Sequence, residues 1–429
     1  MSLLKELPEL LQAGVITEET ADGIRKYYGQ KKATAAASRS FTAFAIIGAT
    51  LVGLGIILIL AHNWDELSRT VKSLIAFMPL VAGQALCAYV LFSRRSSTAW
   101  REGSAVFLVF AVGASISLIS QVYNIPGSFE GFILTWSLLS LPLVYIMQSS
   151  LTSLLYITAI ALYAGEAGFG YNSEPPLLYF GLLTLIIPFY IRRIKRHPLS
   201  NFNTFHHWLL PASMALSFGS MATREEELMF VAFMSLFGAF YLFGRYLFSD
   251  KVAGFRNGFG FIGAVGMIII LLMLSFRDMW QGISTKLSPP SQLYVAPELY
   301  LAIVTTLIAA IILIIDIRNR KVSLFQPLAN VFWLFPPVFV LGIFQPLAGA
   351  ILVNLLLLVT GIYFIRQGAV NNHLGILNFG MLIIAALITC RFFDSDLPFS
   401  IRGILFILVG IGFFMANFLM IKKRRNHAA

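Results

Sequence analysis

Charged residues are scarce in this chain. Aspartate, glutamate, lysine and arginine make up 12% of its 429 residues, whereas 58% are hydrophobic. Soluble domains carry roughly a quarter charged residues. This shortage of charge excludes a soluble enzyme, a disordered chain and a nucleic-acid-binding domain. What remains is a protein that crosses a lipid bilayer several times.

Residue types that form metal and redox sites are also few. The two cysteines, Cys87 and Cys390, lie in separate apolar segments and form no CxxC pair. They predict no disulfide framework, and we interpret them as small residues of packed helices. His206 and His207 lack the spacing of helical metal ligands, and beside Trp208 they are better explained as anchors at the membrane interface. The sequence therefore predicts no metal, no cofactor and no catalytic residue.

The alternation of apolar and polar residues that marks barrel strands is absent too. The apolar runs are continuous, and a helix needs about 20 such residues to cross a bilayer. The sequence predicts an all-α polytopic membrane protein with about 14 transmembrane helices. The segments lie near 43–61, 73–93, 104–123, 130–147, 151–165, 176–194, 206–222, 228–248, 258–276, 297–315, 324–344, 346–365, 373–390 and 399–421. Because 151–165 and 206–222 are short or weakly apolar, a count of about 12 also fits.

The basic residues predict the orientation of the chain. Most of the 31 lysines and arginines gather in clusters that are separated by an even number of these segments. The main clusters are 1–40, 94–101, 192–196, 245–256, 318–321 and 422–425. By the positive-inside rule this face is cytoplasmic, so we expect both termini there with either helix count. The polar start of the chain does not resemble a cleavable signal peptide, and we expect the first apolar segment to be retained.

The first forty or so residues predict a short cytoplasmic helical hairpin and linker. Leucines recur at helical spacing, Gly14 is suited to end a first helix, and Thr17 is suited to cap a second one. The hairpin fits two roles: docking on the membrane or on loops of the bundle, and contact with a protein partner through residues 1–30. The predicted organisation is a hairpin and linker at 1–40, a transmembrane bundle at 41–421 and a basic tail at 422–429.

A dinucleotide-binding pattern, GxGxxG, occurs at residues 258–263. That fingerprint requires a strand before it and an acidic residue about 20 positions later. Here it opens an apolar segment, and Gly266 extends it. We therefore expect a seam where helices pack closely, and no nucleotide site.

Polar residues after the first and third predicted helices form the main candidate binding site. They are Asn63, Trp64, Asp65, Lys72, Gln121, Tyr123 and Asn124. By the predicted topology both groups lie at the extracytoplasmic ends of helices, where they form either a polar outward-facing pocket or an ordinary belt of aromatic and polar residues.

These same stretches resemble a known family. LQAGVITEETADGIRKYY (11–28), GATLVGLGIILILAHNWDELSRTVK (48–72) and ISLISQVYNIPG (116–127) are similar to the bacterial predicted membrane proteins grouped as domain of unknown function 2157. The similarity covers roughly the first 150 residues. It implies a bacterial inner-membrane protein. The family offers no established activity, so the resemblance implies only that Asn63, Trp64, Lys72, Gln121 and Tyr123 matter.

The middle of the predicted helices holds no ionisable residue. The polar residues near mid-depth are the neutral amides Gln84, Asn330, Asn354 and Asn378. Because proton-coupled antiporters usually relay protons through intramembrane acids, this absence argues against that class. It is compatible with uniport or with the transport of a lipid-like substrate.

Two classes of function follow. The first is a transporter or flippase-like permease for a small or lipid-like substrate, with a cavity that reaches Gln84, Asn354 or Asn378. The alternative is a non-transporting envelope scaffold or sensor that contacts a partner through residues 1–30. An enzyme with Asp65 or Glu66 as acid or base is a weaker third reading, because no catalytic motif accompanies them. The bilayer is the one partner that the composition itself implies, and the substrate is not encoded in any motif.

Overall fold

The computed structural model describes most of the chain between residues 66 and 392. The described residues are 7, 10–24, 26, 66–169, 175–196, 200–247, 256–289, 293–319, 326–392, 400, 403, 404, 407, 410–412, 414 and 415. The chain forms two compact units, residues 1–77 and residues 78–429. The border between the units falls within the first long helix described, α3 (Arg69–Ser93).

The first unit contains the predicted helical turn. Residues 10–12 are helical and end at Gly14, whose φ of +68° lies in the left-handed region that favours glycine. The amide of Val15 donates to the carbonyl of Leu10 at 3.0 Å, which closes this end. The second helix begins at residue 18, where the Thr17 hydroxyl accepts from the amide of Thr20 at 3.4 Å. The predicted stop at Gly14 and the predicted cap at Thr17 are thus confirmed.

Helices form nearly all of the second unit, and no strand occurs in the described part of it. After α3 come α4 (Thr98–Tyr123), α5 (Phe129–Ile146), α6 (Ser150–Phe169), α7 (Leu178–Arg196), α8 (Asn201–Gly219), η1 (Glu226–Leu228), α9 (Met229–Leu247), α10 (Gly258–Met273), α11 (Arg277–Lys286), α13 (Pro297–Arg318), α14 (Pro327–Phe344), α15 (Pro346–Val370) and α16 (Leu374–Phe392). The all-α class is confirmed. Each predicted segment between 73 and 390 coincides with one of these helices, and the segments near 43–61 and 399–421 lie outside the described residues.

Nine helices of the described residues are long and apolar enough to cross a membrane, or ten if α10 and α11 form one bent span. The predicted segments at α7 and α8 are not among them. Basic residues fill the last turn of α7, and α8 begins with the polar stretch NFNTFHH. The total of about 14 spans stays a prediction.

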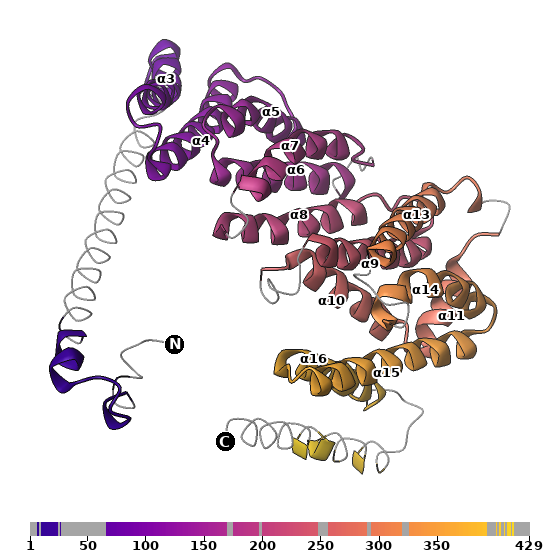
Figure 1. The fold of residues 1–429 in the computed structure, drawn as a ribbon. Coiled ribbons are helices and arrows are strands. Elements are labelled where there is room, and N and C mark those ends of the chain that lie inside the picture. Colours follow the sequence, from indigo (N-terminus) through magenta and orange to yellow (C-terminus); the bar gives the residue numbers. More distant parts are fainter. Residues whose placement is uncertain are drawn as a thin grey trace. The chain divides into compact units, whose positions relative to one another are not determined.

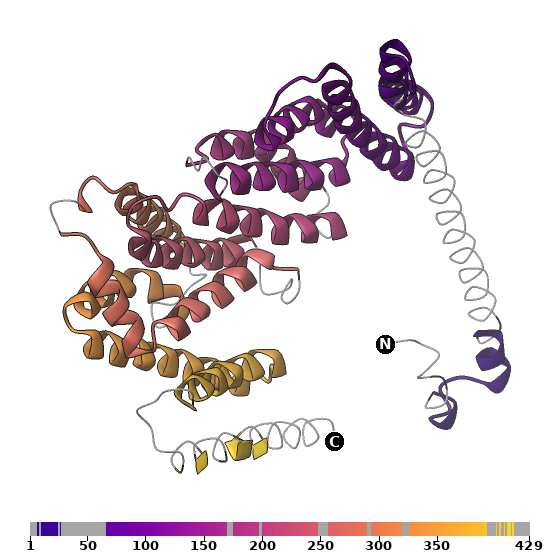
Figure 2. The ribbon, with the colours of Figure 1, turned by 180° about the vertical axis from the view of Figure 1, so that it is seen from behind.

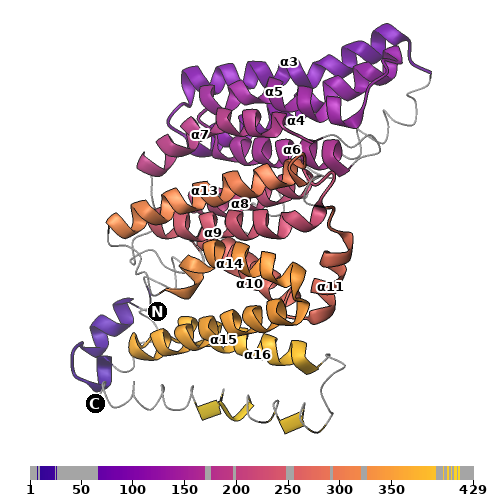
Figure 3. The same ribbon diagram turned by 90° about the vertical axis from the view of Figure 1, so that its right-hand side faces the viewer.

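The labelled helices of the second unit form a row from α4 at one end to α16 at the other (Figure 1), as the view from behind also shows (Figure 2). Within this row the order departs from that of the chain, because α13 and α14 pack on α9, and α11 packs on α15. Most of them run along a shared direction, and α11 crosses that direction (Figure 3). Among the described residues, two large hydrophobic cores hold most of them together. One lies among α9, α10, α11, α13, α14, α15 and α16, and the other among α5 to α10 and α13.

The glycine pattern at the start of α10 lets this helix approach α9 closely. A Cβ added at Gly263 would stand 2.9 Å from the Cα of Tyr241, and one added at Gly266 would stand 2.6 Å from the ring of Phe237. Gly260 instead donates its amide to the Asn257 side chain at 2.9 Å, which caps the helix. The prediction of a close-packing seam is confirmed.

Candidate functional site

The predicted polar residues between helix ends lie partly outside the described residues, because Asn63, Trp64 and Asp65 belong to the part that is not described. Lys72 is half-buried in the first turn of α3. Their role in binding stays a prediction.

The end of α4 carries the other predicted binding residues. Gln121 and Tyr123 are exposed in its last turn. Asn124 caps the helix in the left-handed conformation with a φ of +50°, and its amide donates to the carbonyl of Gln121 at 3.4 Å. Among the described residues this helix end is therefore an exposed polar surface.

The four predicted mid-membrane amides have different surroundings. Gln84 and Asn378 are exposed on the sides of their helices. Asn330 is buried, donates to the carbonyl of Gln326 at 2.8 Å and accepts from the indole of Trp333 at 2.9 Å. The Asn354 amide donates to the carbonyl of Ser275, which lies at an interruption of the helical chain.

That interruption is the break between α10 and α11. The two helices meet at an angle of 87°, across the residues Leu274–Phe276. Such a break frees backbone carbonyls that inside a membrane must find other donors, since an unsatisfied group there costs several kcal/mol. The indole of Trp280 donates to the carbonyl of Leu274 at 2.7 Å. Trp280 is fully buried, with its ring against Gly342 and Gly349, two positions where a Cβ would collide with it.

The carbonyl of Ser275 is held by side chains from two later helices. The Asn354 amide on α15 donates to it at 2.9 Å, and the Arg391 guanidinium on α16 donates to it at 3.0 Å. Arg391 also donates to the Ser275 hydroxyl at 3.0 Å and lies 4.6 Å above the centre of the Phe276 ring. The break is thus an organised feature whose donors come from residues about 80 and 116 positions away in sequence.

An apolar groove of about 330 Å³ lies among α7, α8, α9, α10 and α13. This volume is at the lower end of ligand sites, which run from about 300 to 1,000 Å³. Representative lining residues are Leu183, Ile187, Leu210, Met214, Phe240, Phe259, Ile308 and Ile312.

Only two of the residues that line this groove, Tyr190 and Thr305, carry a side-chain oxygen. The Thr305 hydroxyl donates to the carbonyl of Leu301 within its own helix at 2.7 Å. The Tyr190 hydroxyl is buried and has no hydrogen-bond partner among the described residues. The groove therefore presents an apolar wall with a single unsatisfied hydroxyl beside it.

His206 and His207 are not interfacial anchors, and that prediction was wrong. Their side chains are 1% and 3% exposed. The His206 Nε2 lies 2.6 Å from the Ser153 hydroxyl, and the His207 Nδ1 lies 3.1 Å from the carbonyl of Arg256. The His206 ring stacks on Tyr190, with ring centres 5.9 Å apart. The first turns of α8 are covered by α6, α7 and α10, which buries these polar side chains inside the protein.

Sequence reasoning missed both the break and the groove. The run LLMLSF (271–276) stays apolar through the break, so hydropathy alone gave no sign of it. The polar stretch RDMWQG that follows at 277–282 was the available signal. The groove is lined by five helices that are distant in sequence, and no local pattern encodes such an assembly.

Comparison with known proteins supports the membrane assignment. The model of a family described as "Predicted membrane protein (DUF2157)" matches residues 8–169. This match covers the part of the chain for which the sequence suggested that family. Searches of curated proteins and of solved structures each found no match to the chain. The chain is therefore similar to a predicted membrane protein family over residues 8–169.

Proposed function

We propose that the protein is a flippase-like permease of the bacterial inner membrane that moves a lipid-like, amphiphilic substrate. Its basic helix ends would face the cytoplasm, as would both termini. The observation that carries this proposal is the groove among α7, α8, α9, α10 and α13, because its lining is apolar and its helices include spans of the bilayer.

The lining favours an acyl chain over a hydrophilic solute. A sugar or an ion in this groove would lose its hydration and find almost no polar group to replace it. An acyl chain needs no such partner. Inside a bilayer it gains little from the hydrophobic effect, so its binding rests on close contacts with side chains such as Phe240, Phe259 and Ile308.

The buried hydroxyl of Tyr190 suggests why the substrate would be amphiphilic. A buried polar atom without a partner costs about 1–3 kcal/mol. A polar group at one end of the substrate would supply the missing partner and recover that cost. Tyr190 would then distinguish a lipid-like molecule from a plain hydrocarbon.

The break between α10 and α11 supports a role in transport. Discontinuous helices often build the substrate sites of transporters, and alternating access moves one group of helices against another around such a site. Phe259 lines the groove near the start of α10, and the break follows the other end of the same helix. A change of angle at the break would therefore reshape one wall of the groove.

A lipid-transfer assay with a matched pair of variants tests this proposal. Full-length protein is reconstituted into vesicles that carry a fluorescent phospholipid, and the loss of inner-leaflet protection from a membrane-impermeant reductant is followed. Ile308 lines the groove and is 47% exposed, whereas Ile311 on the same helix is 57% exposed and does not line it. We expect Ile308→Trp to slow transfer several-fold by filling the groove, and Ile311→Trp to leave the rate unchanged.

Two results would contradict the permease. The first is a transfer rate for the unaltered protein that equals that of protein-free vesicles. The second is an equal effect of both tryptophan variants, which would mean that the groove takes no part. Thermal unfolding of both variants in detergent serves as the control for folding.

A second candidate is the scaffold or sensor, and it is favoured by the well-formed turn near the start of the chain. Gly14 and Thr17 close a helix–turn–helix in which Leu7 and Ala21 are buried, whereas Val15 is 67% exposed. If this hairpin contacts a protein partner, deletion of residues 1–30 removes the partner from the purified membrane complex and leaves lipid transfer unchanged. Retention of every co-purifying protein after that deletion would argue against this role.

A further inference from the structure

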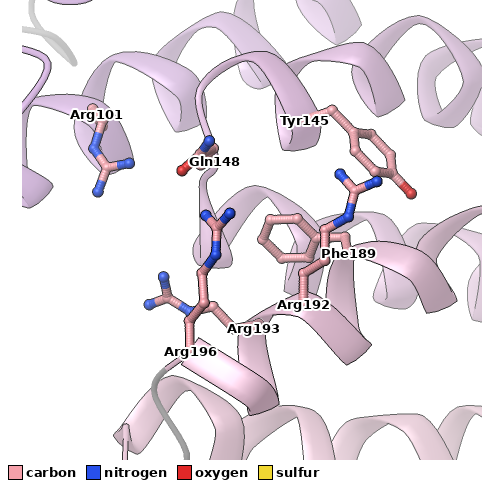
Figure 4. A pocket seen from close by; sticks show the side chains of 7 residues that line it. All are labelled: Arg101, Tyr145, Gln148, Phe189, Arg192, Arg193 and Arg196. Carbon is pink, nitrogen blue, oxygen red and sulfur yellow. The ribbon is translucent and has the colours of Figure 1, made fainter.

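A small cavity of about 130 Å³ lies among the start of α4, the end of α5, the turn that follows α5 and the end of α7, and four of its seven lining residues are arginines. Arg101 comes from the first turn of α4, and Arg192, Arg193 and Arg196 come from the end of α7. Tyr145, Gln148 and Phe189 complete the lining. Figure 4 shows Arg101 and Gln148 on one side and the arginines of α7 rising towards them from another helix.

The guanidinium groups around this cavity have no protein acceptor in the part of the chain that the structure describes. The Nε atoms of Arg101 and Arg193 are buried and make no hydrogen bond there. The carboxylate of Glu102 acts on Arg193 electrostatically. Four like charges gathered without close counter-charges repel one another, so this arrangement is costly unless an anion joins them.

Glu102 cannot serve as that anion, because its carboxylate already holds the start of α6. It accepts hydrogen bonds from the Ser149 hydroxyl at 2.5 Å, the Ser150 amide at 2.9 Å and the Leu151 amide at 2.9 Å. The carboxylate satisfies backbone donors that every helix N-terminus leaves open. Both carboxylate oxygens of Glu102 therefore accept hydrogen bonds from the start of α6, and the four arginines can bind another anion.

The turn between α5 and α6 presents a further donor to the cavity. Gln148 has a φ of +49°, in the left-handed region that costs a residue other than glycine about 1 kcal/mol or more. Its side chain lines the cavity, and a glutamine amide donates hydrogen bonds to anions as well as accepting them. The turn therefore has an unfavourable backbone conformation at the same residue whose polar side chain faces the arginines.

We infer that this cavity binds the phosphate group of an anionic ligand. Arginine forms paired, charge-assisted hydrogen bonds with phosphate oxygens, and several arginines around one small cavity suit a doubly charged group. Ordinary basic residues at a membrane face extend into water, whereas here two guanidinium groups are partly buried and all four border one space. Basic pockets between membrane helices are a known form of site for lipid head groups. The phosphate can belong to a phospholipid or to free phosphate, and the site stands independently of the proposed lipid transfer.

The test compares ligands that differ only in the phosphate group. The full-length protein in mild detergent is mixed with dioleoyl phosphatidic acid or with dioleoylglycerol, and bound lipid is counted by native mass spectrometry. Radiolabelled inorganic phosphate is tested separately by equilibrium dialysis. Arg193→Gln and Arg192→Gln each remove one guanidinium from the cavity. Lys195→Gln is the matched control, because it removes the same charge from the same turn of α7 but does not line the cavity.

We expect phosphatidic acid to bind and dioleoylglycerol not to bind. Each arginine variant should weaken phosphatidic acid binding about tenfold, and Lys195→Gln should change it less than twofold. Arg192 is exposed, so Arg192→Gln should fold normally. Lipid binding can then still be measured on this variant if Arg193→Gln fails to fold. If inorganic phosphate binds with the same dependence on the two arginines, the source includes free phosphate; if phosphatidic acid alone binds, the source is a lipid head group. Equal binding of the two lipids, or equal losses in the arginine and Lys195 variants, overturns the site.

Discussion

The guanidinium of Arg391 donates hydrogen bonds of 3.0 Å to both the carbonyl and the hydroxyl oxygen of Ser275. The two residues lie 116 positions apart, one in the last turn of α16 and the other in the break between α10 and α11. The Arg391 side chain thus donates to a backbone carbonyl that has no helical hydrogen-bond partner because of the break. The conformation of the break depends on a helix that follows it much later in the chain.

Loss of this cation should weaken the fold. We expect Arg391→Leu to lower the free energy of unfolding by about 2 kcal/mol, because hydrogen bonds to charged groups contribute about 1.5–3 kcal/mol and the Ser275 oxygens lose a donor. Arg277→Leu is the control, since Arg277 is exposed at the start of α11, and it should change stability by less than about 0.5 kcal/mol. Thermal unfolding in detergent measures both, and equal melting temperatures for the two variants would refute this role of Arg391.

Asn354 and Arg391 should act as a coupled pair, because both donate to the carbonyl of Ser275. Residues that share one hydrogen-bond partner typically show coupling of about 0.5–3 kcal/mol in a double-mutant cycle. We therefore expect the stability losses of Asn354→Ala and Arg391→Ala not to add. Asn330→Ala, whose amide bonds within α14, should add to Arg391→Ala and provides the reference cycle. Additive losses for the first pair would mean that the two donors hold the break independently.

The seam between α9 and α10 should tolerate no added methyl group. We expect Gly263→Ala to destabilise the protein by about 1–3 kcal/mol, the usual range for overpacking, because its Cβ would press on the α9 backbone at Tyr241. Gly282→Ala on α11 is the control, since a Cβ there meets nothing within 4 Å. This second change should be neutral or stabilising by up to about 1 kcal/mol, as for glycine to alanine in an open helical position. Melting temperatures of the two variants measure this difference, and equal values would contradict close packing at Gly263.

Glu102 should affect stability and anion binding in opposite directions. Glu102→Gln weakens the hydrogen bonds to the start of α6, so we expect a loss of about 1–2 kcal/mol in the free energy of unfolding. The same change removes a negative charge near Arg193, which should raise the affinity for inorganic phosphate a few-fold. Glu166→Gln, an exposed residue at the other end of α6, should change neither quantity. Unchanged phosphate affinity in Glu102→Gln would show that this carboxylate is too far from the bound group to matter.

The predicted orientation can be tested with single cysteines in a variant that lacks Cys87 and Cys390. Asn371 follows α15 and should lie at the basic, inward side, whereas Asn124 follows α4 and should lie outside. We expect a membrane-impermeant maleimide to label Asn124→Cys in right-side-out vesicles and Asn371→Cys only in inverted ones. Labelling of both positions from the same side would exclude the predicted number of crossings between them.

The sequence predicted the helical elements well because their signal is local. Long apolar runs mark α3 to α6 and α13 to α16, and a glycine with a threonine three positions later marked the turn at Gly14 and Thr17. The glycines that begin α10 were correctly assigned to helix packing, since their context lacked the acid and the strand of a nucleotide site. Each of these inferences depended on residues within a few turns of one another.

The candidate sites could not be predicted because they join distant residues. Charge clusters at 94–101 and 192–196 were expected on one face, and the structure brings Arg101 and Arg193 to one cavity. Gln148, which also lines this cavity, lies in a left-handed turn that no local preference would have indicated. Burial of His206 and His207 likewise follows from how α6, α7 and α10 cover α8, and not from the two histidines themselves.

The donors at the break also have a mechanical consequence. Asn354 and Arg391 tie the junction after α10 to α15 and α16, while Trp280 ties α11 to the glycines of α14 and α15. The segment Leu274–Lys286 therefore has to travel with the last described helices as one body. A hinge motion in this part of the molecule would then occur where α10 meets the break, while α10 itself is held on α9 by the contacts of Phe259 with Phe240 and Phe243. We therefore expect a tilt of α16 to move the start of α11 with it, through the contacts of Arg391 with Ser275 and Phe276.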